Sequence, residues 1–213
     1  MPAGRAQNGA MLPRRDGELV QIVEASLADA TERARTPAGG SWLACRPGCT
    51  PCCHGVFRIS ALDAERLRAA HQVLQREDPA RATAVLARAL ERIEQLRPHF
   101  PGDAISGVLD PEDEAWEAFA DLPEAEAACP VLDPATGRCD LYTGRPLTCR
   151  VFGPPVQNES GIGICELCYV GASEAEILHG EMYLQHADLE AELDATLPSE
   201  ETIIAWALLP ATS

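Results

Sequence analysis

Three stretches in the first half of the chain carry apolar residues at helical spacing. Residues 18–33 are the first, and we read a helix there because apolar positions recur every three or four residues. The second stretch, 60–77, begins at a serine with the spacing of a capping box. The third, 79–96, begins at a proline, which the first turn of a helix tolerates. Because only Asp78 separates the last two, they should pack as an antiparallel hairpin.

The second half of the chain gives shorter signals. Two apolar segments flank a turn-forming Asp-Pro-Ala-Thr-Gly within residues 131–142, which predicts a β-hairpin. A capping-box spacing at Ser173 predicts a helix to about Leu193, and a last short helix is expected over 199–209. The acidic segment 101–128 should be loose, with one short helix.

These patterns predict a mainly α fold with a small β-hairpin and an irregular core, so the fold class is α+β. Alternating strands and long helices are not found, and we therefore expect neither a doubly wound sheet nor a barrel.

The composition restricts the function. The 213 residues carry a formal net charge of −16, and all 17 basic residues are arginines. Such an acidic chain is a poor ligand for nucleic-acid phosphates and offers no polybasic patch to anionic lipids. The longest apolar run, 203–209, is too short to cross a membrane. We expect no nucleic-acid and no membrane partner, and the absence of lysine excludes P-loop and Schiff-base chemistry.

Nine cysteines, an odd number, cannot all pair within one chain. The first 17 residues have no apolar stretch of the kind found in a secretory signal. We therefore expect a cytoplasmic protein with reduced thiols, where clustered cysteines favour metal binding over disulfides. An oxidised disulfide protein is the alternative, and it would need an export route.

Four of the cysteines lie within nine residues, in the run CRPGCTPCC. Thiolates two or three residues apart in a turn can converge on one metal, and Gly and Pro supply such turns. The run therefore predicts four metal ligands: Cys45, Cys49, Cys52 and Cys53. Side chains of adjacent residues normally diverge, so either Cys52 or Cys53 should bind a different metal, bridge two metals or pack as a buried thiol.

Five further cysteines follow in the second half of the chain. Cys129, Cys139 and Cys149 follow one another at intervals of ten residues. This spacing alone fits core residues and metal ligands equally well. Cys165 and Cys168 form a C-x-x-C, for which we favour a metal role over a redox pair.

Two arginines, Arg145 and Arg150, flank Cys149. Guanidinium groups beside an anionic thiolate centre stabilise it and can donate hydrogen bonds to sulfur. We expect both arginines to support the cofactor in this way.

The C-x3-C-x2-C-C run, followed by CPVLDPATGRCDLY and GRPLTCRVF, resembles the YkgJ-like cysteine-cluster family of zinc- or iron-chelating domains. The motifs cover residues 43–152. The resemblance implies that Cys129, Cys139 and Cys149 are ligands that complete one composite centre with the first run. Whether Cys165 and Cys168 join the same site stays open.

The expected domain organisation follows from these motifs. Residues 1–16 are polar and rich in Gly, Pro and Arg, so we expect them to be disordered. The remainder, 17–213, should be a single domain with helices packed around a cysteine-ligated centre. Its expected parts are a metal core from 43–58 and 129–170, an inserted helical hairpin over 60–97, and C-terminal helices over 173–209.

The function expected is metal binding in an accessory, metal-handling or electron-transfer role, with zinc or an iron–sulfur cluster as cofactor. Thiolate sulfur serves both metals, so spacing cannot choose between them. One branch of the family resembles the flagellin lysine methylases, which implies an alternative: an iron–sulfur enzyme acting on a partner protein. Cys45, Cys49 and Cys52 also have the spacing of radical-SAM enzymes, but those carry it on a barrel.

Overall fold

The computed structural model describes residues 12–158 and 161–209, and within them the chain forms helices and small two-stranded antiparallel sheets. The α-helices are α1 (Asp16–Arg33), α2 (Ala61–Glu77), α3 (Pro79–Leu96), α4 (Asp113–Ala120), α5 (Leu147–Val151), α6 (Glu174–His179), α7 (Ala187–Asp194) and α8 (Ile204–Ala207). Four short 3-10 helices are η1 (Pro51–Cys53), η2 (Arg97–His99), η3 (Pro123–Glu126) and η4 (Tyr142–Gly144).

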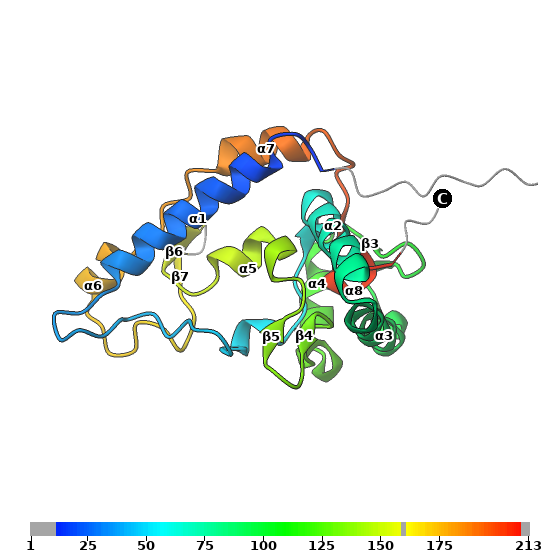
Figure 1. Ribbon diagram of the computed structural model, residues 1–213, viewed down its shortest axis with the longest axis horizontal. Coiled ribbons are helices and arrows are strands. Elements are labelled where there is room, and N and C mark those ends of the chain that lie inside the picture. Colours follow the sequence, from blue (N-terminus) through cyan, green and yellow to red (C-terminus); the bar gives the residue numbers. More distant parts are fainter. Residues whose placement is uncertain (1–11, 159–160, 210–213) are drawn as a thin grey trace, which may run out of the picture.

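Each sheet pairs two short strands. The pairs are β1 (Ile59–Ser60) with β8 (Glu201–Thr202), β2 (Gly102–Asp103) with β3 (Val108–Leu109), β4 (Leu132–Asp133) with β5 (Arg138–Cys139), and β6 (Val156–Asn158) with β7 (Gly161–Gly163). Along the long axis of the molecule, α6 lies toward one end and α2, α3 and α8 toward the other, while α1 runs from the α6 end to the middle, where α5 and α7 lie (Figure 1). The expected α+β class is confirmed, and the described residues form two-stranded sheets in addition to the predicted hairpin.

The three helices predicted in the first half are confirmed, and Ser60 and Asp78 cap the second and third of them. The Ser60 hydroxyl accepts a hydrogen bond from the backbone N–H of Asp63, at 3.3 Å, and so begins α2. Asp78 ends α2 and begins α3, where its carboxylate accepts the N–H of Arg81 at 3.0 Å. The predicted β-hairpin also forms, as β4 and β5.

Both predicted C-terminal helices are wrong in length. The single helix expected from Ser173 to Leu193 is two helices, because α6 ends at His179 with Gly180 as its C-cap, and the N–H of Met182 instead donates to Pro155 O at 2.7 Å. The helix expected over 199–209 is reduced to α8, since Glu201 and Thr202 pair with β1.

Helix α2 is the element around which the interior is built. Its residues Ala64 and Leu67 belong to an apolar cluster with α3 and α8, while Leu62 belongs to another with α1, α5 and α7. Helix α3 supplies Ile93 and Leu96 to a third cluster with α4 and α8. The stretch 60–97, expected as an insertion, therefore contributes buried residues to three apolar clusters.

The expectation of disorder over 1–16 falls mainly on residues 1–11, which lie outside the described residues. Asp16 is the first residue of α1 and is buried, so the helix begins two residues earlier than predicted. None of the helices within 12–158 and 161–209 has the length and hydropathy that crossing a membrane would require.

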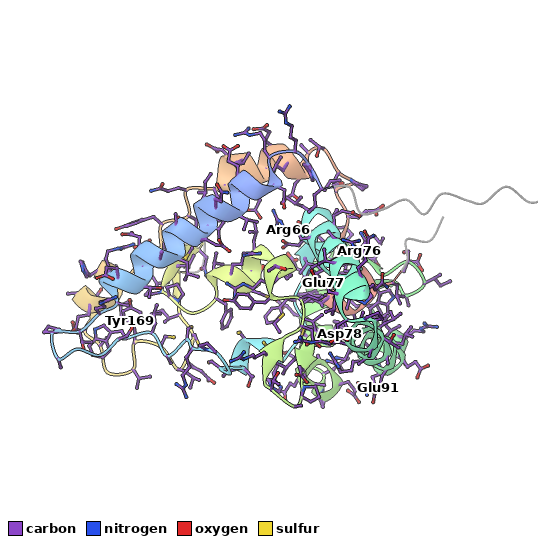
Figure 2. The ribbon with its side chains drawn as sticks, viewed as in Figure 1. Arg66, Arg76, Glu77, Asp78, Glu91 and Tyr169 are labelled. Atoms are coloured by element: carbon purple, nitrogen blue, oxygen red, sulfur yellow. The ribbon has the colours of Figure 1, made fainter. Side chains whose placement is uncertain are left out.

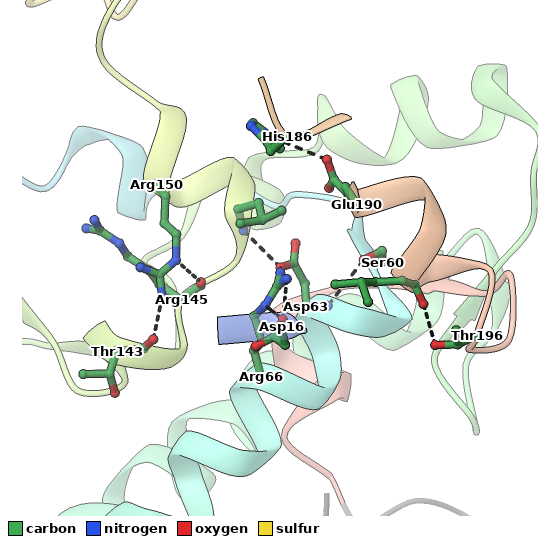
Figure 3. Close-up of polar contacts among 12 residues, drawn as sticks. Asp16, Ser60, Asp63, Arg66, Thr143, Arg145, Arg150, His186, Glu190 and Thr196 are labelled. Carbon is green, nitrogen blue, oxygen red and sulfur yellow. Dashed lines mark hydrogen bonds and ion pairs between the residues drawn. The ribbon is translucent and has the colours of Figure 1, made fainter. Parts of the chain in front are cut away.

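A buried ionic network joins α1, α2 and α5 (Figure 3). The Arg66 guanidinium is 3% exposed and lies between the carboxylates of Asp16 and Asp63, with 2.6 Å from its Nε to Asp16 Oδ1. Asp63 Oδ1 also accepts the backbone N–H of Leu147, the first residue of α5, at 3.0 Å. Three segments far apart in the chain thus depend on one buried cation.

Replacing Arg66 should destabilise the protein strongly. Arg66→Leu leaves two carboxylates buried without a counter-charge, and we expect a loss of about 3–5 kcal/mol in the free energy of unfolding. Chemical denaturation measures it. Arg35→Ala is the control, because the Arg35–Glu32 pair is 70% and 68% exposed and should contribute at most about 1 kcal/mol. Equal losses in the two variants would contradict a structural role for the buried pair.

Candidate metal centre

All nine cysteines lie within the described residues, and all are free thiols. They fall into two sets, and within each set the thiols lie close enough to shift one another's pKa. The five-thiol set is Cys53 with its neighbours Cys52, Cys129, Cys139 and Cys149. The four-thiol set is Cys45 with its neighbours Cys49, Cys165 and Cys168. The CRPGCTPCC run is therefore divided between the two sets, after Cys49.

Backbone hydrogen bonds assemble the five-thiol set from three segments. The N–H of Cys129 donates to the carbonyl of Cys53 at 2.7 Å, which ties η1 to the segment before β4. Cys139 lies on β5 opposite Leu132, whose N–H donates to Cys129 O at 2.9 Å. Cys149 comes from α5, the helix held by the Arg66 network.

The thiols of this set lie in an apolar environment. Cys129 is a member of the apolar cluster of α2, α3 and α8, and Cys53 and Cys139 pack against that cluster. Burial raises the pKa of Cys129 and of Cys149 to about 12 in each case. A hydrogen bond between the adjacent thiols lowers the pKa of Cys53 and raises that of Cys52. Cys129 is thus fully buried, the other four thiols of the set are half-buried, and Cys129 and Cys149 carry their protons at neutral pH.

Two tight turns assemble the four-thiol set. In the first, the N–H of Cys49 donates to Arg46 O at 2.9 Å, and in the second the N–H of Cys168 donates to Cys165 O at 2.8 Å. The backbone N–H of Ala44 points at Cys168 Sγ, 3.4 Å away. Burial, followed by the neighbouring thiols, raises the pKa of Cys45 to about 12.

Aromatic and glycine residues that the sequence reasoning missed fix these turns. Tyr169 stacks on Trp42 with ring centroids 6.3 Å apart, and its N–H donates to Trp42 O at 2.8 Å. Tyr169 has a φ of +54°, a left-handed conformation that is rare for a bulky residue. A side chain at Gly153 would lie 2.7 Å from Cys45 Sγ, so only glycine leaves room for that sulfur. The aromatic residue directly after CELC was the available signal.

The two predicted arginines occupy different places. Arg145 lies over the ring of Tyr142 at 4.0 Å, and its charge acts to lower the pKa of Cys52, Cys139 and Cys149. The Arg150 guanidinium instead donates to the carbonyls of Thr143 and Arg145 (Figure 3). It also pairs with Glu24 of α1. Arg150 thus holds the loop that carries Arg145.

The thiols do not surround a common point in this arrangement. Among residues 12–158 and 161–209, no three His, Cys, Asp or Glu side chains are arranged to hold an ion as they stand. The donor chemistry nevertheless fits a soft or borderline metal, because each set offers four or more thiols. Binding at a metal–sulfur distance of about 2.3 Å requires the cysteine side chains to turn inward.

Clustered free thiols on tight turns are typical of proteins that bind metal through thiolates. In agreement, residues 44–169 match a family model described as "CxxCxxCC: Putative zinc- or iron-chelating domain". The match covers more than half of the chain and includes all nine cysteines, so the chain belongs to this family. It also extends beyond residue 152, where the motifs recognised in the sequence end. The searches of curated proteins and of solved structures found no match.

Arg145→Gln should weaken metal binding by the five-thiol set. Loss of the positive charge raises the free energy of the thiolates, and we expect roughly a 10-fold loss of affinity, in the range typical of residues that support ligands. Competition with a chelator measures it. Arg138→Gln is the matched control, because Arg138 is an exposed residue on β5, next to Cys139. If Arg138→Gln lowered the metal affinity as much as Arg145→Gln does, the loss would come from the change in net charge alone.

Proposed function

We propose that the protein binds zinc or iron through its cysteine thiolates, and that the metal organises the surrounding fold. An accessory, metal-handling or electron-transfer role follows from that chemistry, with a protein as the partner. The observation that carries the proposal is the five-thiol set. Thiols from η1, the β4–β5 hairpin and α5 are gathered within one apolar region, without disulfides and with Arg145 beside them.

The division of the thiols weighs against the radical-SAM alternative. That chemistry needs Cys45, Cys49 and Cys52 on one cluster, whereas Cys52 belongs to the five-thiol set and the other two to the four-thiol set. Throughout the described segments, the strands form two-stranded antiparallel pairs, which do not make a parallel barrel.

A reducing compartment, the cytoplasm, suits the proposal. Free thiols of this density persist where glutathione and thioredoxin keep them reduced. The net charge of −16 supports the expectation that nucleic acid is not a partner.

Anaerobic purification followed by elemental analysis and a visible spectrum tests the proposal. We expect zinc or iron in a fixed ratio to the chain, with sulfide and visible absorption in the case of an iron–sulfur cluster. A protein that purifies without metal and is nevertheless fully folded would refute the proposal.

Removing the metal should destabilise the fold. Metal ligation in thiolate sites contributes folding free energy, about 10 kcal/mol or more for structural zinc. Dialysis against a strong chelator should therefore lower the unfolding midpoint, and re-addition of zinc or ferrous iron should restore it. Magnesium is the control, since it prefers oxygen ligands and should restore nothing. An unfolding midpoint that does not change on chelation would argue for a purely apolar core.

Metal affinity should rise with pH over an unusually wide range. Each ligating thiol must lose its proton, so protons are products of binding and high pH favours it. An ordinary thiol is ionised above about pH 8.5, where the dependence would level off. Burial holds the pKa of Cys129 and Cys149 at about 12 in the metal-free protein. Affinity should therefore still increase between about pH 8.5 and 10, by up to tenfold per pH unit for each proton released. Competition titrations across this range measure it, and a plateau near pH 8.5 would contradict the prediction.

A further inference from the structure

The two thiol sets lie in separate parts of the interior. Cys53, Cys129 and Cys139 belong with the apolar cluster of α2, α3 and α8. Cys165 and Cys168 belong with a different cluster that contains Trp42 and Tyr169. Figure 2 shows Tyr169 near one end of the long axis, and the labelled residues of the α2–α3 hairpin, such as Glu91, near the other. A single ion shared by both sets would have to draw its ligands from two separate apolar clusters.

Within the four-thiol set, the ligand spacing is that of a closed site. One pair is C-x3-C on the turn that contains Pro47 and Gly48, and the other is C-x2-C at 165–168. Two such pairs from opposing turns are the usual donors of a tetrahedral structural site with four sulfur ligands. One contact in the set already favours a thiolate, because the backbone N–H of Ala44 is directed at Cys168 Sγ, 3.4 Å away.

We propose that the nine cysteines form two separate metal centres, and that Cys45, Cys49, Cys165 and Cys168 hold one tetrahedral ion on their own. This inference deepens the proposed function and rests on it. The ion is a divalent cation that accepts four thiolates, zinc or ferrous iron. The five-thiol set forms the second centre.

The position of the four-thiol site assigns it a structural task. The segment after α1 and the segment before α6 run side by side at this point (Figure 1), joined by the Trp42–Tyr169 stack and by the hydrogen bond from Tyr169 N to Trp42 O at 2.8 Å. An ion with two ligands from each segment would cross-link them. It would thereby hold the end of α1 in place independently of the α2–α3 hairpin.

Two double variants test the separation, each serving as the control for the other. Cys165→Ser/Cys168→Ser should reduce zinc or iron by one ion per chain and leave Cys45 and Cys49 open to alkylation under native conditions. Cys52, Cys53 and Cys149 should stay protected. The converse variant, Cys129→Ser/Cys139→Ser, should expose the rest of the five-thiol set and leave the four-thiol set protected. Mass spectrometry of the alkylated full-length protein identifies the labelled cysteines. Exposure of both sets by either pair would overturn the inference.

The wild-type chain provides a second measurement if a variant does not fold. During stepwise chelation under nitrogen, Cys45, Cys49, Cys165 and Cys168 should become reactive together, in a step separate from the other five. Simultaneous reaction of all nine would mean one shared centre and would refute two centres while leaving metal binding intact. A chain that carries no metal, with all nine thiols reactive from the start, would instead refute the proposed function itself.

Discussion

A guanidinium group without access to water determines how the two halves of this molecule meet. Arg66 is fixed between Asp16 of α1 and Asp63 of its own helix, and Asp63 in turn anchors the first residue of α5. Charges buried in this way are expensive unless each finds its partner, so the arrangement tolerates few alternatives. Because α5 carries Cys149, the same network fixes the position of this member of the five-thiol set.

The thiols depend on packing that lies outside the cysteine motifs. Cys129 reaches Cys53 through a backbone hydrogen bond, and Cys139 is placed by the register of a four-residue sheet. Beside the four-thiol set, Tyr169 adopts a left-handed backbone conformation, and its stack on Trp42 offsets the conformational cost. Gly180 makes room for the Tyr169 ring, since a Cβ at that position would overlap it. Backbone and aromatic contacts thus supply the shape, and the cysteines supply the donor atoms.

Local signals in the sequence predicted much of the fold, because they act over a few residues. The caps at Ser60 and Asp78 and the turn between Leu132 and Cys139 were recognisable, and α2, α3 and the β-hairpin followed. The break between α6 and α7 was not, since it depends on distant partners such as Pro155 and Tyr169.

The sequence was enough to propose which cysteines form the candidate site, but not how they divide into two sets. The sequence showed which residues carry sulfur, and it indicated that a metal was the reason. The boundary between Cys49 and Cys52 arises from tertiary contacts: Trp42 with Tyr169 on one side, and Cys53 with Cys129 on the other. The burial of Arg66 and Asp63 was not predictable, because nothing near them in the sequence shows that α1 and α5 cover them.

The short connection between the two thiol sets couples them electrostatically. Only Thr50 and Pro51 separate Cys49 from Cys52, so the Cα atoms of these two cysteines can be at most about 11 Å apart. That separation is close to the Debye length at moderate ionic strength, about 10 Å, so salt screens the thiolates of one set from the other only in part. Ionising one set therefore makes ionisation of the other more costly, and a cation held by either set offsets that cost. Ionisation and cation binding in one half of the CRPGCTPCC run therefore change the free energy of ionisation in the other half.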